Sequence, residues 1–152
     1  MAMNEVKLHR VLTASPEKVF RAFTDPDALA AWLPPYGFTC KVHSMNVEAG
    51  GRYSMSFTNF STGTTHRFGG EYLEIIPNER LRYTDQFDDP NLPGSMITTI
   101  ELMKLSCGTA LFASQTGIPD AIPPEMCYLG WQESLDKLKR LVEPHIPDGN
   151  EQ

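Results

Sequence analysis

The chain has 152 residues, of which 41% are hydrophobic and 21% are charged, and its formal net charge is −6 at pH 7. This length and composition are typical of a soluble globular protein that builds its own core, so we expect a single domain over residues 1–152. A net negative charge repels phosphate backbones, and no basic stripe offsets it, which argues against nucleic-acid binding.

The cysteines, the histidines and the first residues of the chain bear on compartment and cofactors. Cys40, Cys107 and Cys127 are odd in number and widely spaced, which indicates neither a disulfide framework nor a metal site. The four histidines show no HxH or HExxH spacing, so we expect no metal and no other cofactor. The first ten residues are too polar for a signal peptide, and no apolar run approaches the ~20 residues of a membrane span. We therefore expect a cytoplasmic protein.

The first elements are a strand and two short helices. Residues 5–13 mix apolar and polar side chains as a strand does. Ser15 is a good N-cap and Pro16 suits the first helical position, so a helix is predicted to begin there. Pro26 ends this helix because proline disfavours helical geometry at the preceding residue. A second short helix is predicted over residues 26–32.

Six further strands are predicted, connected mostly by short turns. The clearest covers residues 51–60, where large apolar side chains alternate with polar ones. Strands joined by tight turns pair antiparallel, so the segment is expected to form a meander. The six predicted strands are residues 38–45, 51–60, 66–76, 80–87, 95–105 and 109–116.

The last predicted element is a long amphipathic helix over residues 123–142, stopped by Pro144, with residues 144–152 as a frayed tail. Strands segregated from a terminal helix indicate an α+β fold rather than a parallel α/β sheet. The predicted apolar stripe consists of Cys127, Gly130, Trp131, Ser134, Leu138, Leu141 and Val142, with Leu135 at its edge.

Several short sequence patterns resemble a known superfamily when they are taken together. They are residues 15–26 and 29–32, residues 48–53 around Gly50 and Gly51, residues 70–84, the Gly108-Thr109 pair, and Gly130-Trp131 with the leucines that follow. In this order the chain resembles the START-like (SRPBCC) helix-grip superfamily. Within it, the chain is similar to the bacterial activator of Hsp90 ATPase homolog 1-like proteins. The resemblance implies a curved antiparallel sheet wrapped around the long C-terminal helix, with a cavity between them.

The resemblance does not fix the function, because the superfamily includes lipid carriers, hormone receptors, polyketide cyclases and chaperone activators. Large side chains at inner positions either line a ligand cavity or simply fill a core, and the sequence leaves both alternatives open. A glycine inside the last helix, Gly130, favours a cavity slightly, since it costs ~1 kcal/mol relative to alanine. The candidate ligand-binding residues are Trp32, Tyr53, Met55, Phe57, His66, Tyr83, Met126 and Trp131.

Three functions remain as hypotheses. The first is non-enzymatic binding of a small hydrophobic or aromatic molecule, oriented by Tyr53, Tyr83 and His66, in a monomer or homodimer. The second is an enzyme of the polyketide-cyclase or dehydratase type, in which His43 or His66 works with Tyr83 or Asp85 in proton transfer. The third is a chaperone cofactor of the Hsp90 type. The eukaryotic activator uses an additional N-terminal domain, so we expect no ATPase stimulation here, and we assign no catalytic residue.

Overall fold

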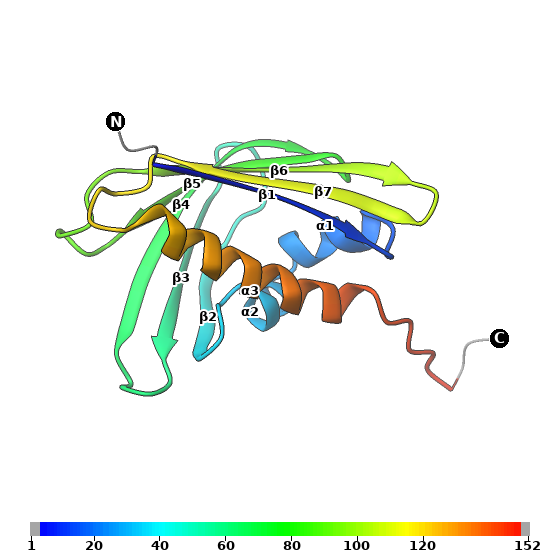
Figure 1. Cartoon of the computed structure of the whole chain (residues 1–152), viewed down its shortest axis with the longest axis horizontal. Coiled ribbons are helices and arrows are strands. Elements are labelled where there is room, and N and C mark those ends of the chain that lie inside the picture. Colours follow the sequence, from blue (N-terminus) through cyan, green and yellow to red (C-terminus); the bar gives the residue numbers. More distant parts are fainter. Residues whose placement is uncertain (1–3, 150–152) are drawn as a thin grey trace.

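Residues 4–149, which the computed structural model describes, form one seven-stranded antiparallel sheet and three helices (Figure 1). The sheet is curved, and the long C-terminal helix runs along one side of it, which confirms the predicted α+β helix-grip fold. None of the helices in this part of the chain combines the length and apolar character that a membrane span requires. In chain order the elements are β1 (Glu5–Leu12), α1 (Pro16–Thr24), α2 (Pro26–Trp32), β2 (Phe38–Met45), β3 (Arg52–Asn59), β4 (Thr65–Ile76), β5 (Arg80–Phe87), β6 (Met96–Leu105), β7 (Gly108–Thr116) and α3 (Pro124–Val142).

The sheet order is β1-β7-β6-β5-β4-β3-β2, and every neighbouring pair is antiparallel. Strands β2 to β7 therefore form the predicted meander. The first strand crosses to the far edge and pairs with the last one, from Glu5 opposite Thr116 to Leu12 opposite Thr109. This return of β1 places it in contact with α3, which helps to hold the helix against the sheet.

Side-chain caps explain the two short helices. Ser15 Oγ accepts a hydrogen bond from the amide of Lys18 at 3.2 Å, as an N-cap does. Asp25 both follows the last residue of α1 and caps α2, because its Oδ1 accepts from the amides of Asp27 and Ala28 at 2.9 and 3.1 Å. The chain thus turns sharply at Asp25, where the proline that follows predicts a break.

The buried face of α3 differs from the predicted stripe at two positions, Leu135 and Leu141. Leu135, Leu138 and Val142 are no more than 2% exposed, so Leu135 lies at the centre of the buried face rather than at its edge. Leu141 is 42% exposed, and its predicted place in the stripe is wrong. The reason is rotation around the helix, since neighbouring residues lie about 100° apart and Val142 already faces the core.

Polar contacts fasten α3 to the segment that follows α2. Ser134 Oγ donates to the carbonyl oxygen of Leu33 at 2.6 Å, and Lys137 Nζ donates to the carbonyl oxygen of Pro34 at 2.8 Å. These bonds satisfy backbone oxygens in a stretch where the prolines interrupt regular structure. They join α3 to this segment beside a pocket that both elements line.

Candidate functional site

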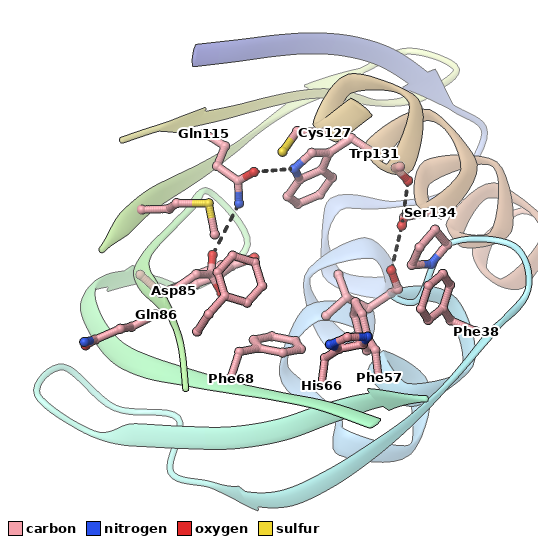
Figure 2. Close-up of a pocket in the computed structure, with 16 residues that line it drawn as sticks. Phe38, Phe57, His66, Phe68, Asp85, Gln86, Gln115, Cys127, Trp131 and Ser134 are labelled. Atoms are coloured by element: carbon pink, nitrogen blue, oxygen red, sulfur yellow. Dashed lines mark hydrogen bonds between the residues drawn. The ribbon is translucent and has the colours of Figure 1, made fainter. Parts of the chain in front are cut away.

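A pocket of about 300 Å³ lies between α3, the inner face of the sheet and the segment after α2 (Figure 2). Leu33 and Pro35 close it on one side, and Gly130 and Ser134 lie in its helical wall. Most of the wall is apolar. Apart from His66, the aromatic side chains in it are Phe38, Phe57, Phe68, Tyr83, Phe87 and Trp131.

Four of these rings come from four consecutive strands of the meander and pack against one another. Phe57 of β3 and Phe68 of β4 meet edge to face with centroids 4.8 Å apart. The ring centroid of Phe38 on β2 lies 6.5 Å from that of Phe57, and the ring centroid of Phe87 on β5 lies 6.3 Å from that of Phe68. Such spacings are those of favourable aromatic pairs, so the rings make a continuous wall rather than isolated contacts.

The other side of the pocket carries a chain of hydrogen bonds (Figure 2). Trp131 Nε1 on α3 donates to Gln115 Oε1 on β7 at 3.2 Å. Gln115 Nε2 in turn donates to Thr98 Oγ1 at 3.1 Å and, over a longer 3.5 Å, to Asp85 Oδ2. Thr98 Oγ1 donates to the same carboxyl oxygen at 2.8 Å. The helix is therefore connected through polar side chains to Asp85, the one carboxyl group that residues 4–149 contribute to the lining.

Tyr53 completes the surroundings of this carboxyl group. Its hydroxyl lies within hydrogen-bond reach of the carbonyl oxygen of Thr84, at 2.7 Å, and of Asp85 Oδ1. A phenol carries one hydrogen and does not donate fully to both oxygens at once. Protonation of Asp85 at Oδ1 removes the competition, because the carboxyl group then donates to Tyr53 Oη while Tyr53 donates to Thr84.

Burial is the main influence on the ionisable groups here. It raises the pKa of Asp85 above its ordinary value, while the hydrogen bonds from Tyr53, Thr98 and Gln115 act in the opposite direction. Burial likewise raises the pKa values of Tyr53 and Tyr83 far above neutrality, so both phenols stay uncharged. Within residues 4–149 no ion pair involves Asp85, and no lysine, arginine or histidine is among the groups that shift its pKa.

The backbone of β4 and β5 determines where the carboxyl group points. Tyr83, Asp85 and Phe87 alternate along β5 and share its inner face. The neighbouring strand approaches closely at Gly70, where an added Cβ would overlap the carbonyl oxygen of Thr84. Glycine at this position therefore permits the strand pairing that sets Asp85 against the pocket.

The structure brings four of the eight sequence-predicted residues to this pocket. Phe57, Tyr83 and Trp131 lie in its wall. His66 also lines it, but this residue is exposed, and it pairs across the strands with Phe57. His43, the other histidine considered for proton transfer, is exposed on β2 and hydrogen-bonded to Ser56 Oγ at 2.9 Å rather than lining the pocket.

The other four predicted residues lie elsewhere. Tyr53 and Met55 are buried beside a void of only about 20 Å³, deeper in the sheet. Trp32 is fully buried in the core, where its Nε1 donates to the carbonyl oxygen of Ala22 at 2.8 Å. Met126 is 59% exposed. The residue of this helical turn that lines the pocket is the next one, Cys127, which lies about 100° further around the helix. The sequence-based placement of Trp32, Tyr53, Met55 and Met126 around the same pocket therefore differs from the structure.

The sequence-based candidates omitted the polar end of the pocket. Asp85 was considered only as a possible proton-transfer partner of His43 or His66, and Gln115 and Thr98 were not considered. A signal for the last two was present, since each is a polar residue at an inward position of a strand whose neighbouring inward residues are apolar. Cys127 lines the pocket, and burial raises the pKa of its thiol, as expected for an inert side chain.

Comparisons with known proteins agree on the fold. The family model for activator of Hsp90 ATPase homolog 1-like proteins matches residues 13–143. A crystal structure of a protein from Chromobacterium violaceum is similar with a TM-score of 0.92 and 62% identity, covering 93% of this chain and 99% of that one. A Rhodobacter sphaeroides protein has a TM-score of 0.81 at 22% identity, covering 92% of each chain, and so supports the fold alone. A Mesorhizobium loti protein has a TM-score of 0.68 at 26% identity, covering 90% of this chain and 95% of that one. No curated protein matches the sequence.

Proposed function

We propose that this protein, which belongs to the activator of Hsp90 ATPase homolog 1-like family, binds a small hydrophobic or aromatic molecule in the pocket beneath α3 without transforming it. The observation that supports this most is the aromatic wall opposite a small set of hydrogen-bonding groups. Ligand sites in proteins have this composition, with apolar surface for affinity and few polar groups for orientation.

The size of the pocket limits the ligand. About 300 Å³ is at the lower end of the range for small-molecule sites, so a compact ligand with one or two rings fits the proposal. Phe57, Tyr83 and Trp131 would contact its apolar part, and His66 would lie at the exposed edge. Tyr53, which lies deeper, would act by holding Asp85 in place.

Gly130 offers a direct test, because it lines the pocket and an added Cβ there meets nothing within 4 Å. Gly130→Phe would place a ring in the pocket, and Gly130→Ala is the matched control that adds only a methyl group. Wild-type protein and the alanine variant are expected to gain thermal stability with an aromatic ligand, about 2.7 kcal/mol at a concentration of 100 times Kd. The phenylalanine variant is expected to lose this gain while it keeps its fold.

The readouts are thermal unfolding against a panel of one- and two-ring compounds and the fluorescence of Trp131, which lines the pocket. Trp32 in the core is the other tryptophan of the chain, so the Trp131→Phe variant reports the fluorescence of Trp32 alone. A ligand-dependent change that this variant lacks comes from Trp131. If Gly130→Phe binds the same compounds as tightly as the wild type, the ligand does not enter this pocket and the proposal is wrong.

A second candidate is an enzyme of the cyclase or dehydratase type. The observation that favours it is a carboxyl group with a raised pKa beside the neutral phenols of Tyr53 and Tyr83 in an apolar pocket. Neutral donors in such surroundings stabilise a developing oxyanion on a bound carbonyl compound. Turnover of a cyclisable polyketone that is lost in Asp85→Asn and retained in His66→Gln would favour this candidate over binding alone.

A further inference from the structure

We propose that the pocket selects aromatic amines in their cationic form, held by the carboxylate of Asp85 and by the faces of the surrounding rings. This inference rests on the proposed function, because it requires the ligand to enter the pocket. It adds the charge of the ligand, which neither the family nor the apolar wall specifies.

The first argument is that the buried carboxyl group has no cationic partner among residues 4–149. Asp85 is 8% exposed, and its hydrogen-bond donors Tyr53, Thr98 and Gln115 are all neutral. Removing a carboxylate from water is costly unless an opposite charge compensates it. A carboxyl group that lines a pocket and lacks an internal partner is well suited to a partner that arrives with the ligand.

The second argument is that Asp85 can accept a further donor. Its two oxygens have about four lone-pair directions, and the protein supplies two good donors and one long contact of 3.5 Å from Gln115. An ammonium group that reaches Oδ2 would replace this weakest contact with a charge-assisted hydrogen bond. Gln115 would remain anchored, because it is also bonded to Thr98 and Trp131.

The third argument comes from the walls. A cation is attracted to the face of an aromatic ring, most strongly to tryptophan, and the lining contains Trp131, Tyr83 and several phenylalanines. Within the described residues 4–149, no lysine or arginine lines the pocket to repel a cation. An anionic ligand would instead meet Asp85 without compensation.

An ammonium group beside Asp85 also acts on the proton equilibrium of this carboxyl group. Burial favours the protonated form, whereas the hydrogen bonds from Tyr53, Thr98 and Gln115 favour the carboxylate. A bound cation favours the carboxylate as well. If the carboxyl group is protonated in the free protein, its proton passes to solvent when the cation binds, and the net charge of the pocket does not change. The other titratable groups around this carboxyl group are Tyr72 and Tyr83, with Cys127 and His66 in the same lining.

The test uses three ligands of similar shape and different charge, measured by titration calorimetry at one pH and ionic strength. They are 2-phenylethylamine, 2-phenylethanol and 3-phenylpropionate. We expect the wild type to bind the amine at least about tenfold more tightly than the alcohol, and the carboxylate most weakly. In Asp85→Asn the ratio of amine to alcohol affinity is expected to fall to about one. Glu101→Gln, which removes one negative charge on the opposite face of the sheet, is the matched control and is expected to keep the wild-type ratio.

The outcomes separate this inference from the proposed function. Equal affinity for amine and alcohol in the wild type, or tighter binding of the alcohol, overturns the preference for cations and leaves ligand binding intact. A neutral two-ring compound, 2-naphthol, is measured as well. If it binds and 2-phenylethylamine does not, the preference for cations is likewise overturned and ligand binding is not. Failure of every aromatic compound, charged or neutral, overturns both. The wild-type affinities decide the question even if Asp85→Asn does not fold.

Discussion

Replacing Asp85 by asparagine is expected to raise the free energy of unfolding at neutral pH. The amide keeps the shape of the protonated carboxyl group, accepts from Thr98 through its oxygen and donates to Tyr53 through its nitrogen. It therefore reproduces the neutral form that burial favours and removes the charged form that burial disfavours. The native residue is then less stabilising than its neutral analogue, as is common at functional positions.

The sign of the pH dependence follows from the raised pKa. Because the folded protein holds the Asp85 proton more tightly than the unfolded chain, the contribution of this proton to stability is fully present below the unfolded pKa, near 3.9. This contribution is lost as the pH rises through the interval between the unfolded and the folded pKa, and no further change arises from Asp85 at higher pH. In that interval the slope is about 1.4 kcal/mol per pH unit for one proton. Asp85→Asn lacks this contribution.

The assay is urea unfolding of both proteins at intervals of about one unit between about pH 4 and pH 8. The difference between their free energies of unfolding isolates Asp85, because the other ionisable groups are common to both. We expect the variant to gain on the wild type as the pH rises and then to keep a constant advantage. If the difference between the two free energies of unfolding does not change with pH, whichever protein is the more stable, the reasoning about the buried charge is refuted.

Three further predictions concern packing and reactivity. Leu138→Ala on α3 is expected to lower the free energy of unfolding by about 2–5 kcal/mol, while Leu141→Ala on the same helix changes it by less than about 0.5 kcal/mol, both measured by urea unfolding. Gly70→Ala is expected to destabilise the fold and to disturb the β4–β5 pairing, visible as faster amide exchange in β5, since the added methyl group overlaps backbone. Burial raises the pKa of the Cys40 thiol to about 11, so exposed Cys107 is expected to be alkylated first at pH 8, as peptide mass spectrometry would reveal.

Much of the fold was predictable because local signals agree with the tertiary structure. The alternation along β3, the cap at Ser15 and the break at Pro26 each specify one conformation without reference to distant residues. The long terminal helix is predictable for the same reason, although its buried face was predicted too far toward Leu141. A helical stripe depends on which neighbours cover the helix, and in α3 these are β1 and the short helices.

The site was less predictable. The alternation of side chains along a strand predicts which face of the sheet a residue lies on, but not which element packs against that face. Tyr53, Met55 and Phe57 alternate along β3 and point to the same side of the sheet. Only Phe57 meets the 300 Å³ pocket, whereas the other two lie deeper, beside the small void. The difference lies in which helix covers each side chain. Phe23 of α1 and Leu29 of α2 line the void beside Tyr53 and Met55, whereas α3 lines the pocket that Phe57 meets.

The pairing of β1 with β7 also has a consequence for how the chain reaches this structure. The strands from β2 to β7 join their neighbours through short connections, and such hairpins form within microseconds. β1 has to find a partner at the other end of the sheet, with Glu5 opposite Thr116, and the entropy of closing so large a loop slows the search. On the ribosome, the strand that is made first stays unpaired until β7 has emerged. The earliest part of the sheet to be synthesised is thus the last to be completed.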